Sequence, residues 1–199
     1  MKMNHRTRSR AALALALLVP APTIGAAAGL IVLPGPVGQA IYGASKLWLL
    51  ALPLIWLKWV DRGGWSWSPP RRGGFGVAVG LGLAISALIV AGHALAGRHL
   101  VDLAQFRTIV ERNGVGTVGR YVALSLYLIT INSLLEEYVW RWFVFEKWHT
   151  VTGGRLAGWL AVLLAAACFT IHHVVALGAQ FGVSITIIGS AGVFIGGAA

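Results

Sequence analysis

The chain has 199 residues, of which 57% are hydrophobic and only 11% are charged. A soluble domain usually carries about 25% charged residues, so this composition excludes an ordinary soluble globular protein. The net charge of +10 does not indicate a nucleic-acid partner, because the basic residues flank apolar segments, as they do in the cytoplasmic loops of membrane proteins. These flanking residues are Lys2, Arg6, Arg8, Arg10, Lys58, Arg62, Arg71 and Arg72.

Apolar segments of membrane-spanning length follow one another along the chain. A helix of about 20 residues crosses a bilayer, and we place about six spans near 11–33, 38–60, 74–96, 119–145, 155–177 and 181–198. Pro34-Gly35-Pro36 separates the first two, and the Gly- and Pro-containing stretch 63–73 separates the second from the third. The mixed-charge segment 97–118 is compatible with a short interfacial helix around Val101 to Glu111. The predicted fold class is therefore all-α, a polytopic transmembrane helix bundle.

The first 33 residues admit two interpretations. A basic start, an apolar stretch and the small residues Ala26, Ala27 and Ala28 resemble a secretory signal. We favour a retained first span, because it gives a consistent topology with the N-terminus and the basic 61–73 loop inside. The 97–118 loop then lies outside and fits this scheme least well. We predict a multi-pass protein of the cell's inner (cytoplasmic) membrane.

The last apolar run ends at Gly196-Gly197-Ala198-Ala199 without a polar flank. Membrane helices normally finish at aromatic or basic anchors. We therefore expect this chain to be truncated from a protein of about eight spans.

The fourth segment places Glu136, Glu137 and Arg141 after a long uncharged stretch. Each ionisable group near the bilayer centre costs roughly 2.5–3.5 kcal/mol on insertion scales. Glu137 and Arg141 stand four residues apart, acid first, which favours an ion pair, whereas Glu136 projects beside Trp140 and is free to act as a general acid or base. Alternatively, this stretch is a helix end at the headgroups, with Trp140 and Trp142 as interfacial aromatics. The same half of the helix carries Thr130, Asn132 and Ser133.

The fifth segment ends with a pair of histidines. Phe169 and His173 are four residues apart and share a helix face, with Thr170 beside them, whereas His172 points about 100° away. A single membrane histidine is more often a packing residue than a catalyst. Short connections favour antiparallel neighbours, so this pair can meet the polar face of the preceding helix.

The motif Glu136-Glu137-x-x-x-Arg141, followed by Phe169-x-x-x-His173, resembles the first two motifs of the CPBP family. These glutamate-type intramembrane proteases include CAAX prenyl endopeptidases and bacteriocin-processing enzymes, and are also called the Abi family. The resemblance covers roughly residues 119–177. It implies a catalytic core at 119–199, incomplete at its C-terminus, after N-terminal transmembrane helices and loops at 1–118.

By this resemblance, Glu136 and His173 activate the water that attacks the scissile carbonyl. The supporting residues are Glu137, Arg141, Phe169 and His172. The family's third motif, a histidine followed four residues later by Asn or Asp, has no counterpart, because no histidine follows His173. Either that motif lay beyond Ala199 or the chain is a non-catalytic relative; we favour truncation and expect the chain as written not to turn over.

Other functions remain open. Two glutamates and a histidine are plausible zinc ligands, but the spacing His-Glu-x-x-His is absent, so we predict no metal and no cofactor. The predicted partners are a membrane-associated peptide or protein substrate and the lipid bilayer, with no nucleic acid. A non-catalytic membrane protein, such as an immunity or partner-binding factor, is the main alternative. A transporter or proton channel is a third hypothesis, because intramembrane Glu and His often mark proton paths.

Overall fold

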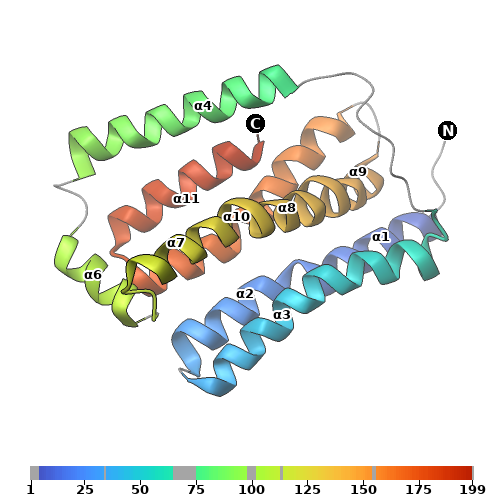
Figure 1. Ribbon diagram of the computed structural model, residues 1–199. Coiled ribbons are helices and arrows are strands. Elements are labelled where there is room, and N and C mark those ends of the chain that lie inside the picture. Colours follow the sequence, from blue (N-terminus) through green and yellow to red (C-terminus); the bar gives the residue numbers. More distant parts are fainter. Residues whose placement is uncertain are drawn as a thin grey trace. The chain divides into compact units, whose positions relative to one another are not determined.

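The computed structural model describes residues 5–33, 35–64, 75–97, 102–112, 114–153 and 156–198. Every regular element in these ranges is a helix (Figure 1), which confirms the predicted all-α class. Some residues used in the predictions lie outside the described residues. They are Lys2, Pro34, residues 65–74 with Arg71 and Arg72, Val101 and Ala199.

The helices follow the predicted segments closely. The first span contains α1 (His5–Leu18), α2 (Pro20–Ala27) and the π-helical η1 (Ala28–Val32). The second contains α3 (Pro36–Ile55) and η2 (Trp56–Val60). The next elements are α4 (Phe75–Gly92), η3 (His93–Gly97) and α6 (Leu103–Arg112). The polar helix contains α7 (Val118–Tyr127), η4 (Leu128–Asn132), α8 (Ser133–Glu136), η5 (Glu137–Val144) and α9 (Phe145–Thr152). The last two helices are α10 (Ala157–Gln180) and α11 (Val183–Ala198).

In the described part of the chain, four helices are long and apolar enough to cross a membrane: His5–Val32, Pro36–Val60, Val118–Thr152 and Ala157–Gln180. Two shorter apolar helices, Val79–Leu95 and Val183–Ala198, correspond to the other predicted spans. The first and fourth helices extend beyond their apolar stretches into polar residues. Long Lys and Arg side chains at helix ends can reach water from such positions.

The chain divides into two compact units, residues 63–121 and residues 1–62 with 122–199. In the unit 63–121, Asp102 Oδ1 accepts the backbone N–H of Ala104 at 2.8 Å and caps α6. Arg107 and Glu111 form an ion pair of 3.0 Å on the same helix. The short helix compatible with the sequence between the third and fourth spans is therefore present, while its interfacial position stays a prediction. The proposed division at residue 118 into N-terminal helices and a catalytic core also stays a prediction.

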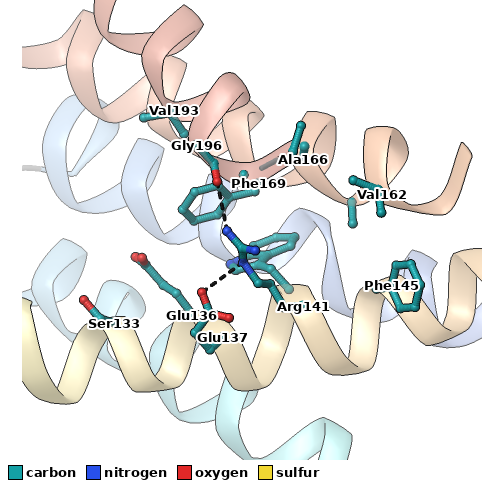
Figure 2. A pocket seen from close by; sticks show the side chains of 14 residues that line it. Ser133, Glu136, Glu137, Arg141, Phe145, Val162, Ala166, Phe169, Val193 and Gly196 are labelled. Atoms are coloured by element: carbon teal, nitrogen blue, oxygen red, sulfur yellow. Dashed lines mark hydrogen bonds and ion pairs between the residues drawn. The ribbon is translucent and has the colours of Figure 1, made fainter. Parts of the chain in front are cut away.

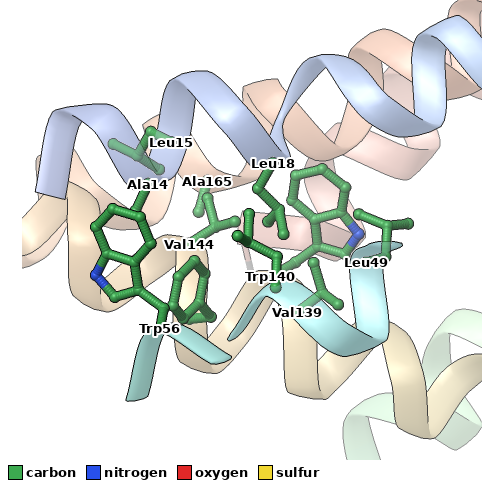
Figure 3. Close-up of a cluster of buried hydrophobic side chains, with 11 residues drawn as sticks. Ala14, Leu15, Leu18, Leu49, Trp56, Val139, Trp140, Val144 and Ala165 are labelled. Carbon is green, nitrogen blue, oxygen red and sulfur yellow. The ribbon is translucent and has the colours of Figure 1, made fainter. Parts of the chain in front are cut away.

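The core of the other unit joins the N-terminal spans to the helix that carries the glutamates (Figure 3). Leu18 of α1 and Val144 of η5 are fully buried, and Phe143 is 1% exposed. Leu49 and Trp56 of the second span pack into the same cluster. The remaining members are Ala14, Leu15, Leu52, Val139, Trp140 and Ala165. The first, second, fourth and fifth spans therefore share one apolar interior.

Small residues bring the first two spans close together. A Cβ atom on Gly38 would collide with the carbonyl oxygens of Ala28 and Leu33, and one on Gly25 would collide with the Ser45 side chain. Membrane helices pack closely where small residues allow their backbones to approach. This hairpin therefore depends on particular glycines.

A part-buried ion pair joins the end of the second span to α9. Lys147 Nζ lies 2.5 Å from Asp61 Oδ2, and the Lys147 side chain is 6% exposed. The ammonium also lies 5.0 Å from the centre of the Phe143 ring. The second and fourth spans thus end side by side, as the predicted topology requires. The helix itself continues to Thr152, beyond the predicted end at residue 145.

Candidate active site

The polar residues of the fourth span line a cavity of about 450 Å³ (Figure 2). Ligand pockets typically measure about 300–1,000 Å³, so a peptide segment can enter it. The lining residues come from the fourth span, α10 and α11: Ser133, Glu136, Glu137, Trp140, Arg141, Phe145, Val162, Ala165, Ala166, Phe169, Val193, Gly196, Gly197 and Ala198. We call this space the large cavity.

Arg141 connects two walls of the large cavity. Its Nε lies 3.0 Å from Glu137 Oε1, which is the ion pair that the four-residue spacing predicts. Its Nη2 donates a hydrogen bond of 2.9 Å to the carbonyl oxygen of Gly196 (Figure 2). A cation is favourable at the carbonyl end of a helix. Arg141 thereby holds η5 against the end of α11, a contact that the sequence alone did not reveal.

Glu136 stays outside this ion pair. Its Oε1 accepts a hydrogen bond of 2.7 Å from Asn132 Nδ2, four residues earlier. The amide is neutral, so it orients one carboxylate oxygen and leaves the second available to another proton donor. Glu137 has a cation as its partner, whereas the partner of Glu136 in the structure is an amide.

Glu136 also lines a second, much smaller cavity of about 20 Å³. Lys46 and His172 line it as well, together with Asn132. The apolar part of its wall consists of Leu49, Leu50, Leu135, Val139 and Trp140. We call this space the small cavity. Glu136 therefore separates a space of peptide size from a space of water size.

His172 packs on the fourth span. Its ring stacks on Trp140 with centroids 5.5 Å apart and 12° between the planes. Its Nδ1 is buried and has no hydrogen-bond partner among the described residues. Buried polar atoms normally have a partner, either protein or water. This nitrogen is therefore available to a small polar molecule.

The His173 side chain has different contacts from the His172 side chain. Its Nδ1 lies 3.0 Å from the carbonyl oxygen of Phe169. Because a carbonyl oxygen only accepts, Nδ1 carries the hydrogen, and in the neutral ring Nε2 is the nitrogen that accepts a proton. The Phe169 ring lies 4.5 Å from the His173 ring and 5.7 Å from Trp140, so Phe169 packs beside the large cavity.

The structure brings only some of the predicted site residues together. Glu136, Glu137, Arg141 and Phe169 line the large cavity, and His172 shares the small cavity with Glu136. His173 is absent from the lining of both cavities, and its pairing with Glu136 stays a prediction. Within the described ranges, no group of three or more His, Cys, Asp or Glu side chains is arranged to hold a metal.

The sequence interpretation did not recognise two polar residues of this site as such. Lys46 lies well inside the second span, and a charge so far from the end of a span is a signal of function. Asn132 was placed on the correct helix face, but its four-residue spacing from Glu136 was not interpreted as a hydrogen bond.

The fold and the site define a multi-pass membrane protein with acidic and histidine side chains at internal cavities. Residues 118–198 match the family model of the type II CAAX prenyl endopeptidase Rce1-like proteins. The match confirms the resemblance that the paired motifs indicated in this part of the chain, and it supports a general role as a membrane protease. No curated protein and no solved structure matches the chain.

Proposed function

We propose that this protein is an intramembrane endopeptidase that hydrolyses a peptide bond of a membrane-associated substrate, with Glu136 as the general base. The observation that carries the proposal is a carboxylate that makes no direct ion pair with any described residue and lines a cavity of ligand size, within the segment that matches the protease family. We further propose the cell's inner (cytoplasmic) membrane as its location, because basic residues flank the first two spans.

The carboxylate of Glu136 accepts a proton from water as that water adds to the scissile carbonyl carbon. The tetrahedral intermediate then collapses, the carbon–nitrogen bond breaks, and the proton passes to the leaving amine. A positioned general base contributes typically 10²–10⁴-fold to such a rate. Asn132 orients the carboxylate by the hydrogen bond to its Oε1.

His173 supplies the second basic group in this proposal. Its Nδ1–H is taken by the carbonyl of Phe169, so Nε2 can receive the proton of water or return it to the leaving amine. Phe169 fixes the imidazole through both the backbone hydrogen bond and the ring contact. The motif spacing Phe-x-x-x-His thus has a direct physical use.

The ion pair of Glu137 and Arg141 holds the wall of the large cavity. Arg141 bonds to both Glu137 and Gly196, which leaves Glu136 as the free carboxylate. Opposite it, Val162, Ala166 and Val193 present an apolar wall. An extended peptide with apolar side chains fits such a surface, because ligand pockets combine apolar walls with a few placed polar groups.

Hydrolysis also needs a donor for the developing oxyanion, and losing one such donor costs about 10²–10³-fold in rate. The family's third motif supplies it by resemblance, and no histidine follows His173. Where the motifs alone led us to expect no turnover, the two basic groups described above lead us to expect cleavage that is slower by about this factor, so the assay needs a high enzyme concentration and long reaction times.

The second candidate is a non-catalytic immunity or partner-binding membrane protein. The observation that favours it is that Arg141, His172 and His173 all have packing or bonding partners within the fold. Such a protein would keep its stability and its partner but cleave nothing.

The deciding experiment reconstitutes the protein in liposomes with a prenylated peptide ending in a CAAX sequence, and with the same peptide unprenylated. We expect the wild type to cleave, with the prenyl group increasing the rate. Glu136→Gln should lose about 10²–10⁴-fold, while Glu146→Gln, an exposed glutamate of the same helix outside both cavities, should cleave as the wild type does. Undiminished cleavage by folded Glu136→Gln would contradict the proposal, and no cleavage by the wild type would favour the partner-binding function.

A further inference from the structure

Lys46 lies well inside the second span, Pro36–Val60, and its side chain is half-buried. Its ammonium lies 5.6 Å from the centre of the Tyr42 ring. A charge at such a depth costs roughly 2.5–3.5 kcal/mol on insertion scales, and such residues usually face a cavity or an opposite charge. The cavity that Lys46 faces is the small one, which it shares with Glu136.

Two ion pairs near the site have both partners inside this unit. Arg141 pairs with Glu137, and Lys147 pairs with Asp61. Among the charged residues that line the large and the small cavity, Lys46 and Glu136 are the two that make no ion pair with a described residue. They carry opposite signs and line the same space. An intramembrane charge that remains uncompensated is expensive, so the two side chains are natural partners.

The small cavity has the size and polarity of a site for one water. Its volume of about 20 Å³ exceeds the roughly 10–15 Å³ that one water needs. Three residues with polar side chains that could bond to that water line the space: Lys46, Glu136 and His172, whose buried Nδ1 has no partner among the described residues. A water with two to four polar partners is stably held.

Contacts next to the small cavity keep the second span against the fourth. Tyr138 donates a hydrogen bond of 3.3 Å from its hydroxyl to the carbonyl oxygen of Leu50. Leu49 is buried against Trp140 and Val139 in the shared core (Figure 3). The backbone of Lys46 is therefore held at a fixed place relative to the helix that carries Glu136.

We propose that Lys46 is a positioning residue for Glu136: through one water in the small cavity, its ammonium compensates the Glu136 carboxylate inside the membrane and orients it. The positioning role rests on the proposed function, whereas the charge coupling does not. The proposal assigns a part of the site to a span outside the segment that matches the family.

A double-mutant cycle on thermal unfolding tests the charge coupling without any activity assay. We expect Lys46→Met to lower the unfolding temperature by several degrees when Glu136 is present, and to have little effect in the Glu136→Gln background. The matched control is Lys58→Met, an exposed lysine of the same long helix, whose effect should add to that of Glu136→Gln. If Lys46→Met alone does not fold, recovery of folding in the double variant shows the same coupling. Additive effects of Lys46→Met and Glu136→Gln, or no recovery, would overturn the proposal.

Cleavage kinetics then test the positioning role. We expect Lys46→Met to lower kcat by at least about 10-fold with KM nearly unchanged, because the lost interaction acts on the reacting carboxylate. Lys46→Arg should restore most of kcat, since it keeps the charge. If Lys46→Met leaves kcat unchanged although the unfolding cycle shows coupling between Lys46 and Glu136, Lys46 has a structural role only and does not position the carboxylate. If the wild type cleaves nothing, the proposed function and the positioning role fail together, while the unfolding cycle still decides the coupling.

Discussion

Two regions of the same compact unit differ sharply in what their sequences reveal. Residues 122–198 carry both polar motifs and lie within the family match, whereas the first two spans, His5–Val32 and Pro36–Val60, lie outside it. Both regions nevertheless contribute to one core. Membrane helices pack through small residues and shape rather than through a recognisable motif. The first two spans can therefore pack in this core without a motif that identifies them.

The polar contacts between the two regions show how much depends on the spans outside the match. Asp61 holds Lys147, and the carbonyl of Leu50 accepts the Tyr138 hydroxyl. Lys46 shares the small cavity with Glu136. The matched region carries both polar motifs, and the second span supplies part of the wall of the small cavity.

The largest expected effect is on the cleavage rate, and it distinguishes the roles of the two histidines of the matched region. His173→Ala should lower the cleavage rate by about 10²–10⁴-fold, because it removes a general base. His172→Ala should act mainly on stability, since it removes the ring stacked on Trp140. Single-turnover cleavage and thermal unfolding of both variants measure the two effects. Equal rate losses would show that sequence spacing does not distinguish their roles.

The ion pair between the two regions comes next. Asp61→Asn should destabilise the protein by about 3 kcal/mol, at the lower end of what breaking a buried pair costs, because Asp61 is 35% exposed while Lys147 is nearly enclosed. Unfolding by heat or denaturant in detergent measures the loss. Lys58→Met, which removes an exposed charge, should change stability little. A neutral Asp61→Asn would mean that the N-terminal spans are not anchored through this contact.

Packing within the N-terminal region gives a smaller effect. Gly38→Leu should cost about 1–3 kcal/mol from overpacking, because its Cβ would meet the carbonyls of Ala28 and Leu33. Gly43→Leu, on the same helix with open space around its Cβ position, should cost much less. The difference in unfolding temperature between these variants is the measurement. Equal losses of stability in Gly38→Leu and Gly43→Leu would show that the close contact between the first two spans is not at Gly38.

The smallest effect concerns the matched region alone. Arg141→Lys keeps a cation for Glu137 but loses the hydrogen bond to Gly196. We expect a loss of about 1 kcal/mol, typical of one hydrogen bond, in the unfolding free energy. Arg141→Gln, which also removes the ion pair, should lose more. If Arg141→Lys lost more unfolding free energy than Arg141→Gln, the hydrogen bond to α11 would matter more for stability than the ion pair with Glu137.

Much of the fold was predictable from the sequence because it follows from local rules. Apolar length and the glycine and proline breaks located the spans, and the four-residue spacing located the pair of Glu137 and Arg141. The positions of Lys46 and Gly196 at the cavities depend on which helix faces meet across spans. No local pattern encodes that choice. The π-helical stretch Glu137–Val144 also changes the rotation from one residue to the next, so an ideal α-helix is an inexact guide beyond Glu136.

The central claim is that the Glu136 side chain faces a polar cavity within the membrane rather than lipid. With Cys168, the single cysteine, replaced by serine, Glu136→Cys and Leu134→Cys can each be treated with a water-soluble thiol reagent in liposomes. Leu134 lies in the same span and is 72% exposed, so we expect it to face lipid. We predict labelling at position 136 and none at position 134. Labelling at position 134 alone, or none at position 136 in a folded protein, would contradict the account.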